Sequence, residues 1–354
     1  TFPDTMPNFD EDPGQRHFSH QVRVDMAIYS ALADEAVSDA GATLLFHAMP
    51  GAVEAIDDGW RLTLCLKQGL RTIEAKTLID CTGDANVVAL AGLPLEINAQ
   101  TQPGTIVCKA AGYDHDALDY EALEAAAQTA VEQGRLRRTD FGWGGEMTRF
   151  FLGSYGGNRV HVVHPDASTS EGRTEAELEG RRALKRLYEF FREQPGLDGF
   201  HYTYHATECG IRETRTIVGQ AKVTADDYLG GKRWPDAVCY AAYPIDIHLP
   251  DEKGLDKRHI PKGIVPTIPR GALLPTGPGP NDGRRMMAAG RCLSADKAAH
   301  SALRVQACCM AMGQAAGANA ALALHEGCEL DAVPMPTLHA LLREHGAIVP
   351  GDVE

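Results

Sequence analysis

The chain of 354 residues lacks several patterns that would assign it to a protein class at once. Its nine cysteines form no CxxC pair and show no metal-ligand spacing, which argues against a zinc site and against a disulfide framework. No apolar run approaches the ~18–20 residues of a membrane-spanning helix, and no basic-then-apolar leader is found. These absences predict reduced thiols, a cytoplasmic location and no membrane partner.

Basic residues are scarce, because 34 Lys and Arg stand against 48 Asp and Glu, for a formal net charge of −14. Such a chain repels nucleic-acid phosphates and anionic membrane surfaces, so no nucleic-acid partner is expected. The length suffices for one large domain or two ordinary ones with a sizeable core. Hydrophobic residues at 44% and charged residues at 23% are typical of a globular protein. Nothing in these totals predicts an oligomeric state.

Periodic spacing of apolar residues predicts a mixture of helices and strands. Helices are expected over 20–40 and 119–134, behind a capping box formed by Thr174 and Glu177, and from near Ser301 onward. Strands are expected at 44–46, 53–56, 61–66, 72–76 and 77–81, and the three from 53 to 76 form a small β-meander.

The order of these elements predicts an α/β fold with an α+β insertion. Helix and strands come first, a long mixed segment follows, and a strand and a helix return at the end. The predicted partition assigns 20–95 and 285–330 to an incomplete Rossmann-like nucleotide-binding domain. Residues 96–284 form an inserted substrate or cap domain, and 331–354 form a C-terminal tail with a short helix.

The segment from Ala288 to Leu322 carries the strongest local signal for a ligand site. A short apolar run meets Gly290 and Arg291, and a polar loop then leads into the long helix. Free backbone N–H groups and the positive end of a helix dipole favour an anionic or electron-rich ligand at such a position. The small residues between Gly313 and Ala320 allow the helix backbone to approach a sheet or a cofactor closely.

Several segments in a fixed order resemble one family of FAD-dependent oxidoreductases. Thr77 to Asp84 (TLIDCTGD), followed by the AGLP ending at Pro94, is similar to an "IDATGD…AGAP" segment of these enzymes. Gly210 to Gly219 (GIRETRTIVG) is similar to their "GIRESRRIVG" segment. Tyr243 to His248, and Gly290 to Cys292 with the later GQAAG, also match. The resemblance spans about residues 20–330 and implies hydride transfer from a small-molecule substrate to an FAD cofactor.

One part of the family pattern is missing from this sequence. Members of the family begin with a strand, a GxGxxG turn and a helix that cradle the ADP pyrophosphate. The nearest glycine cluster, Gly277 to Asp282, contains two prolines and opens no helix. Since the sequence starts at Thr1 without Met, we expect a fragment of a longer, truncated protein. FAD is accordingly expected in the intact protein, and this chain alone can lack it. The alternative is a non-catalytic flavoprotein-like domain that acts as a scaffold or interaction module.

The resemblance places three groups of residues near the cofactor. Thr82, Gly83 and Asp84 form one loop, for which the alternative is a plain turn with Asp84 as helix N-cap. Gly290 and Arg291 form the second, for which the alternative is a solvated arginine in a turn. The third group, at the predicted helix start, would face the flavin edge where negative charge develops on reduction, and consists of Ser301, Ala302, Leu303 and Arg304.

Three residues are predicted to take part in catalysis. His248 and His300 are candidate acid/base groups, because a histidine exchanges protons near neutral pH. Asp246 is available to orient His248, and the alternative for either ring is a structural histidine. Arg212 suits a substrate carboxylate, although its neighbour Glu213 makes a structural ion-pair network at least as good an interpretation. No metal ligand is predicted.

Overall fold

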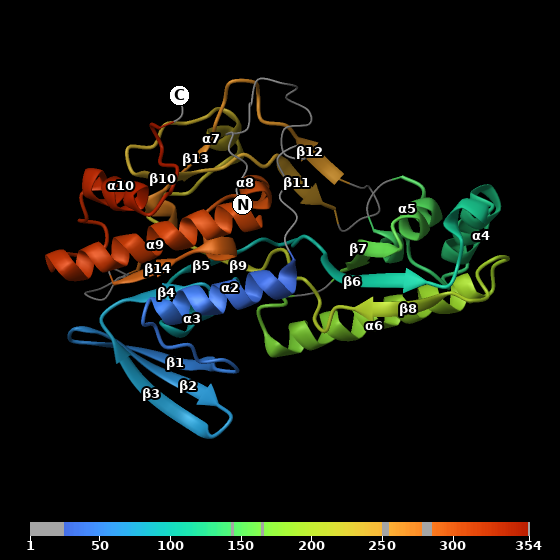
Figure 1. Cartoon of the computed structure of the whole chain (residues 1–354), viewed down its shortest axis with the longest axis horizontal. Helices are drawn as coiled ribbons and strands as arrows, with labels where there is room; N and C mark the ends of the chain where they lie inside the picture. Colours follow the sequence, from blue (N-terminus) through green and yellow to red (C-terminus); the bar gives the residue numbers. More distant parts are fainter. Residues whose placement is uncertain (1–24, 143–144, 164–165, 250–254, 278–284, 353–354) are drawn as a thin grey trace. The chain divides into compact units, whose positions relative to one another are not determined.

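The computed structural model describes residues 25–142, 145–163, 166–249, 255–277 and 285–352 (Figure 1). The chain divides into two compact units, which both combine helices with small sheets, so the fold is mixed α/β. The first unit comprises 1–95, 217–245 and 259–354, and the second comprises 96–216 and 246–258. Residues 217–245 and 259–277, predicted within the insertion, belong to the first unit.

The first unit contains the predicted β-meander. Strands β1 (Met49–Ile56), β2 (Gly59–Leu66) and β3 (Gly69–Ala75) pair antiparallel in that order. Tight turns join them, as the Asp-Asp-Gly sequence predicts. The strand predicted at 44–46 is wrong. Its apolar side chains are exposed, and His47 has a φ of 55°, a left-handed conformation that does not belong to an extended strand.

A short parallel pair of strands lies at the centre of the first unit. Strand β4 (Leu78–Asp80) pairs with β14 (Met286–Ala288), so Asp80 lies beside Ala288. All three residues of β14 are buried, as expected for parallel strands covered on both faces. Both strands end at the same edge, where β4 continues toward α3 (Asn86–Leu90). The loops that follow the two strands are the two predicted cofactor loops.

The long helix predicted from near Ser301 is two helices, α8 (Lys297–Leu303) and α9 (Gln306–Glu326). The Asp296 carboxylate accepts a hydrogen bond from Ala299 N at 2.8 Å and caps α8, so this helix begins before Ser301. Val305 then adopts an extended conformation, with φ −73° and ψ 153°, which interrupts the helix. The predicted start was wrong because helical spacing alone does not reveal such a break.

By length and composition α9 is able to cross a membrane, with 21 residues and a mean hydropathy of 1.3 over its most apolar window. The expectation from the sequence that no apolar run approaches the length of a membrane-spanning helix is therefore wrong for α9. A core helix of a globular protein passes the same test, and 39% of the window is buried inside the protein, so the finding is weak evidence.

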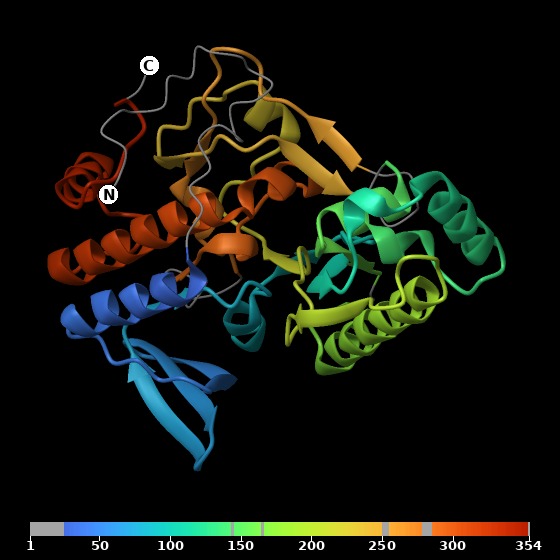
Figure 2. The same ribbon diagram turned by 45° about the vertical axis from the view of Figure 1, so that its right-hand side comes forward.

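Helix α2 (Met26–Asp39) runs beside α9 (Figures 1 and 2), and the Tyr29 hydroxyl lies 3.7 Å from Met310 Sδ. Asp25 caps α2 through hydrogen bonds from Ala27 N and Ile28 N. Residues 20–24, where this helix was also expected, lie outside the described residues. No side chain of α2 is buried.

The second unit is built on a three-stranded antiparallel sheet covered by a long helix. Strand β6 (Gly104–Ala111) lies between β7 (Gly156–Val162) and β8 (His201–His205). Helix α6 (Ser170–Arg192) covers one face, where Gly180 lies against Ile106 and Val162. Aromatic and aliphatic side chains from the sheet, α6, α4 (Tyr120–Glu132) and α5 (Met147–Gly153) fill this core.

The predicted capping box of Thr174 and Glu177 is wrong, because both residues lie inside α6. Thr169 is the N-cap, and its hydroxyl accepts a hydrogen bond from Gly172 N at 3.1 Å. The Thr174 hydroxyl instead donates to Ser170 O within the helix. The Glu177 carboxylate accepts a hydrogen bond from Cys209 N, which lies 32 residues later in the chain. Glu177 therefore makes a tertiary contact and does not cap the helix.

The remaining elements are three to ten residues long. In chain order they are β5 (Leu95–Ile97), η1 (His115–Ala117), η2 (Arg138–Phe141), β9 (Arg215–Ile217), α7 (Ala225–Leu229), β10 (Ala237–Tyr240), β11 (Ile245–His248), β12 (Leu255–Arg258), β13 (Thr267–Pro269), η3 (Arg270–Leu273), η4 (Gly290–Cys292) and α10 (Met335–Glu344).

Candidate active site

A buried carboxylate holds the first predicted cofactor loop in shape. Asp80, at the end of β4, is fully buried, and its Oδ1 accepts hydrogen bonds from Thr82 N at 2.9 Å and Thr82 Oγ1 at 2.7 Å. Its Oδ2 accepts from Val87 N and Val88 N in the first turn of α3. Asp80, rather than Asp84, therefore accepts from the backbone N–H groups at the start of α3. The Asp84 side chain is 19% exposed.

The structure brings the two predicted cofactor loops into contact. Arg291 Nη1 lies 3.4 Å from Asp84 Oδ1, and the two side chains are 25% and 19% exposed. Gly83 has a φ of +81°, and a Cβ built there would lie 2.3 Å from Arg291 Nη2. Glycine therefore allows both the turn and the close approach of the guanidinium. An accessible carboxylate and guanidinium stand together at the carboxyl end of two parallel strands.

The third predicted group lies inside α8. Ser301, Ala302 and Leu303 are fully buried, and the Ser301 hydroxyl donates to Ala298 O at 2.7 Å. Arg304 is the residue at which α8 ends. The helix start with no side-chain cap belongs instead to α9, just after Val305, where backbone N–H groups of the first turn remain available to a ligand.

His300 is tied to the second cofactor loop. Its ring is 2% exposed, and Nε2 lies 2.9 Å from the carbonyl oxygen of Arg291. A neutral ring that carries its proton on Nε2 donates this hydrogen bond and fixes the backbone of Arg291. The geometry suits a positioning role for His300.

His248 and Arg212 both belong to the second unit. His248 is 5% exposed, its Nε2 lies 3.5 Å from Asp246 Oδ2, and its backbone N–H donates to Gln102 Oε1. Arg212 is 7% exposed and donates to Pro103 O, to Thr105 Oγ1 and, at 3.2 Å, to Asn158 Oδ1. Glu213 is fully buried and accepts from Asn98 Nδ2 at 2.7 Å and from Gln102 N at 3.1 Å.

A histidine that the sequence analysis did not single out lies against His248. The ring centroids of His161 and His248 are 5.0 Å apart with an interplanar angle of 77°. Burial lowers the pKa of His161 to about 2, with a further contribution from the charge of Arg212, so the ring is neutral at physiological pH. Strand β7 places His161 beside Thr105 of β6, but the sequence around His161 does not indicate its function.

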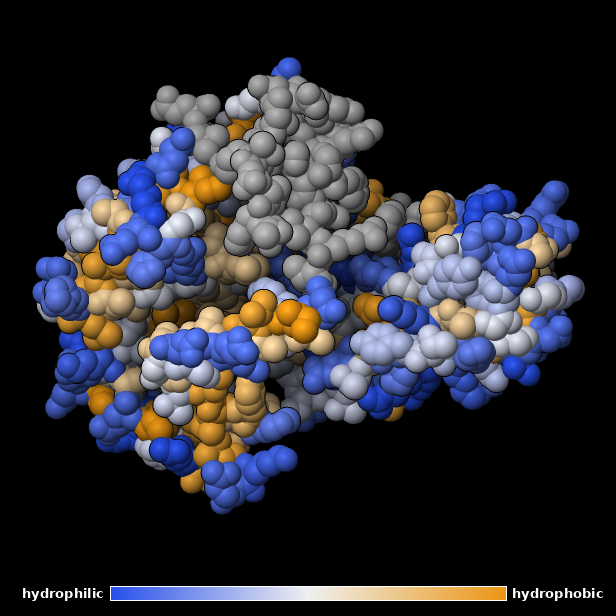
Figure 3. Space-filling view, viewed as in Figure 1, coloured by the Kyte–Doolittle hydropathy of each residue, from blue (hydrophilic) through white to orange (hydrophobic). Residues whose placement is uncertain are grey.

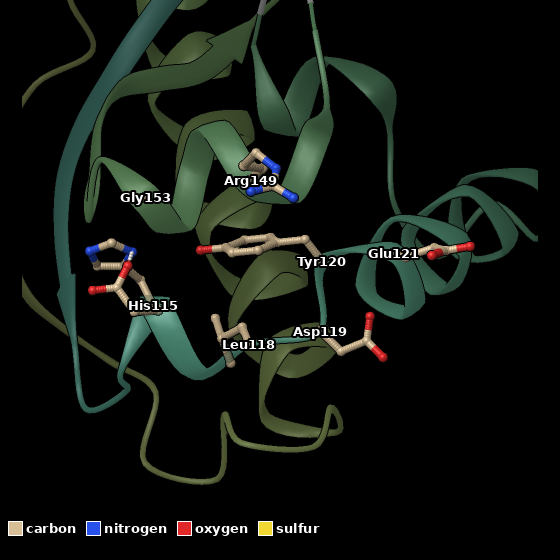
Figure 4. A pocket seen from close by; sticks show the side chains of 8 residues that line it. His115, Leu118, Asp119, Tyr120, Glu121, Arg149 and Gly153 are labelled. Carbon is tan, nitrogen blue, oxygen red and sulfur yellow. Dashed lines mark ion pairs between the residues drawn. The ribbon is translucent and has the colours of Figure 1, made fainter.

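A separate pocket of about 590 Å³ opens on the second unit near the start of α4. Figure 4 shows the Arg149 guanidinium above the Tyr120 ring, 4.4 Å from its centroid, while Glu121 points away. None of the predicted catalytic or cofactor residues lines this pocket, whose lining consists of His115, Asp116, Leu118, Asp119, Tyr120, Glu121, Arg149 and Gly153.

A parallel strand pair that ends in a glycine turn with accessible charged groups defines an α/β protein with a candidate nucleotide-cofactor site. A comparison with known families sharpens this class. The family model described as FAD dependent oxidoreductase matches residues 6–342, so the chain belongs to the FAD-dependent oxidoreductase family. No curated protein matches the chain.

Substitution of Gly83 by alanine tests the contact between the two loops. We expect Gly83→Ala to lower the stability by about 1 kcal/mol through its positive φ and to push the flexible Arg291 side chain away from Asp84. FAD affinity, measured by fluorescence titration, should fall roughly ten-fold, as for one lost charge-assisted hydrogen bond.

Gly92→Ala is the matched control for Gly83→Ala. Gly92 has a φ of +73°, and nothing lies within 4 Å of a Cβ built there. This variant should show the same loss of stability and unchanged FAD affinity. Equal FAD affinities in the two variants would show that the Gly83–Arg291 contact does not shape the cofactor site.

Proposed function

We propose that this protein is an FAD-dependent oxidoreductase that oxidises a small-molecule substrate, with FAD held by the Thr82–Asp84 and Gly290–Arg291 loops of the first unit. The observation that carries this proposal is the accessible Asp84–Arg291 pair at the carboxyl ends of β4 and β14, in a chain of this family. FAD, when bound, supplies the acceptor for a hydride equivalent from the substrate.

The residues of the first unit fit the polar parts of such a cofactor. The Arg291 guanidinium can donate to phosphate or carbonyl oxygens, and the Asp84 carboxylate can accept from hydroxyl groups. Gly83 lets the loop backbone approach a ligand, and His300 holds the backbone of Arg291 in place. The uncapped start of α9 offers further N–H donors and a positive helix end.

In the second unit, we assign to His248 the role of a general base, which accepts the proton that the substrate loses together with the hydride. Its pairing with Asp246 orients the imidazole and stabilises the protonated ring. Arg212, held by Pro103 O and Thr105 Oγ1, is assigned to the binding of an acidic group on the substrate.

FAD titration of the purified protein tests the proposed function. We expect stoichiometric binding, measured by flavin absorbance and fluorescence, and Arg291→Ala should weaken it at least ten-fold through the loss of a charge-assisted hydrogen bond. The control is Arg61→Ala, which removes an exposed arginine that pairs with Glu74 on the β-meander of the same unit. A protein that takes up no FAD would refute the proposal.

A second candidate function, a non-catalytic scaffold or interaction module, is favoured by the surface of α2. Five large apolar side chains of this helix are at least 37% exposed, namely Met26, Ile28, Tyr29, Leu32 and Val37. Figure 3 shows apolar surface over α2 and over the β1–β3 sheet. Exposed apolar patches mark interaction sites. Tight, stoichiometric FAD binding with turnover would exclude a purely structural role.

A further inference from the structure

One face of the β6–β7 sheet in the second unit carries polar side chains, in contrast to the face that α6 covers. The cross-strand partners Ile106 and Val160 belong to the apolar core under α6. Side chains alternate between the two faces of a sheet, so the next partner pair, Thr105 and His161, projects from the opposite face. Arg212 lies on that face, because its Nη1 donates to Thr105 Oγ1.

Two nitrogen atoms in this region are buried and have no hydrogen-bond partner among the residues that the structure describes. They are Nε2 of His161, whose side chain is 4% exposed, and Nη1 of Arg138 at the start of η2. The other terminal nitrogen of Arg138 donates to Gly145 O at 3.0 Å, so the side chain is held in place. Buried polar atoms in folded proteins nearly always have a partner, and two such atoms therefore point to a missing ligand group.

Positive charge surrounds His161. Arg212, Arg138 and Arg159 all act on the ring, and together with burial they lower its pKa. Of the nearby acids, Asp246 pairs with His248, and Glu213 accepts from Asn98 and Gln102. Arg212 is buried, and Arg138 and Arg159 are partly buried. An anion that accepts from the guanidinium groups stabilises such a cluster of cations beside a neutral imidazole.

We infer that His161, Arg138, Arg159 and Arg212 form a binding site for the carboxylate group of a small organic acid. Arg138 Nη1 donates to one carboxylate oxygen, and His161 donates through Nε2 as a neutral ring. The identification of this acid as the substrate rests on the proposed function, whereas the binding itself does not. The inference names the substrate class of the oxidoreductase and adds two residues, His161 and Arg138, to its binding site.

Titration of the whole protein with succinate, followed by calorimetry and by the imidazole ¹⁵N NMR signals, tests this site. We expect succinate to bind, to shift the His161 Nε2 signal, and to bind more tightly than inorganic phosphate or the uncharged succinamide. His161→Gln and Arg138→Gln should each weaken succinate binding roughly ten-fold or more, as for one charge-assisted hydrogen bond.

Two neighbouring residues provide matched controls. Arg137→Gln removes an exposed arginine that pairs with Glu179, and His205→Gln removes an exposed histidine on β8. Both variants should bind succinate as the unmodified protein does. Absence of succinate binding, binding unchanged in His161→Gln and Arg138→Gln, or tighter binding of phosphate would overturn the inference.

FAD binding is measured on the same preparations, so that the oxidoreductase function and the carboxylate site are tested independently. A protein that binds succinate at His161 but no FAD would refute the oxidoreductase assignment and leave the acid site standing. A protein that binds FAD but no succinate would refute the acid site alone.

Discussion

Replacement of Asp80 by alanine is expected to lower the free energy of unfolding by roughly 3–5 kcal/mol, one of the largest effects of any single substitution in the first unit. The carboxylate is fully buried and accepts hydrogen bonds from Thr82 N, Thr82 Oγ1, Val87 N and Val88 N, and the Cys292 thiol lies 3.9 Å from Oδ1. Its removal leaves these donors buried without their acceptor and opens a cavity beneath the loop.

Urea unfolding with hydrogen exchange of peptides from residues 78–92 measures this effect. Asp84→Ala is the control, because Asp84 sits on the same loop with a partly exposed carboxylate and should change stability by less than about 1 kcal/mol. Asp80→Ala should therefore mainly lower the stability, whereas Asp84→Ala should mainly lower the FAD affinity. Similar stabilities of the two variants would contradict the anchoring role of Asp80.

Replacement of Asp140 by alanine is expected to destabilise the second unit by a similar amount, roughly 3–5 kcal/mol. The Asp140 side chain is 1% exposed, and its two oxygens accept from Nε and Nη2 of Arg186 at 2.9 and 2.7 Å. Asp140 also accepts from Arg137 N, and its hydrogen bonds hold the pKa of Arg186 well above its ordinary value. Alanine leaves the guanidinium mostly buried, with Glu179 as its remaining acidic partner.

Glu189→Ala provides the comparison for Asp140→Ala, because Glu189 lies on α6, the helix that carries Arg186. Glu189 pairs with Lys185, but the two side chains are 55% and 73% exposed, so water screens the interaction. This variant should lose no more than about 0.5 kcal/mol, and added salt should abolish even that loss. Thermal unfolding of the two variants at low and high salt distinguishes the buried pair from the exposed one, and a small, salt-sensitive loss for Asp140→Ala would refute its role.

Local sequence patterns predicted those elements whose stabilising contacts are close in the chain. The β-meander follows from alternating apolar residues and a two-residue turn, both of which act between neighbouring strands. Helix α4 follows from the Asp119 cap and the helical spacing behind it. The same kind of reasoning failed at 44–46, at Thr174 and at Ser301. The outcomes there depend on the left-handed conformation of His47, on the Thr169 cap and on extended Val305.

The site residues also differ in whether local sequence patterns or long-range contacts reveal them. The glycine turn at Gly83 and the charged residues Asp84 and Arg291 stand out in the sequence, because they occur next to short apolar strands. Asp80 and His161 do not stand out, because the roles of a buried acid and a strand histidine depend on burial, which distant segments of the chain provide. Asp80 acts on α3 within its own loop, but its burial requires β14, which is more than 200 residues away.

By itself, the sequence determined the α/β character of this protein and its resemblance to FAD-dependent oxidoreductases, and it located the two loops proposed to hold the cofactor. These features depend on contiguous segments of the chain. Only the tertiary structure decided that Arg291 meets Asp84 across Gly83, that Asp80 anchors the loop, and that His161 lies among arginines on one face of a sheet. Those outcomes depend on which side chains from distant segments become buried against one another when the chain folds. Burial and hydrogen bonding of that kind are properties of the folded chain and not of any segment alone.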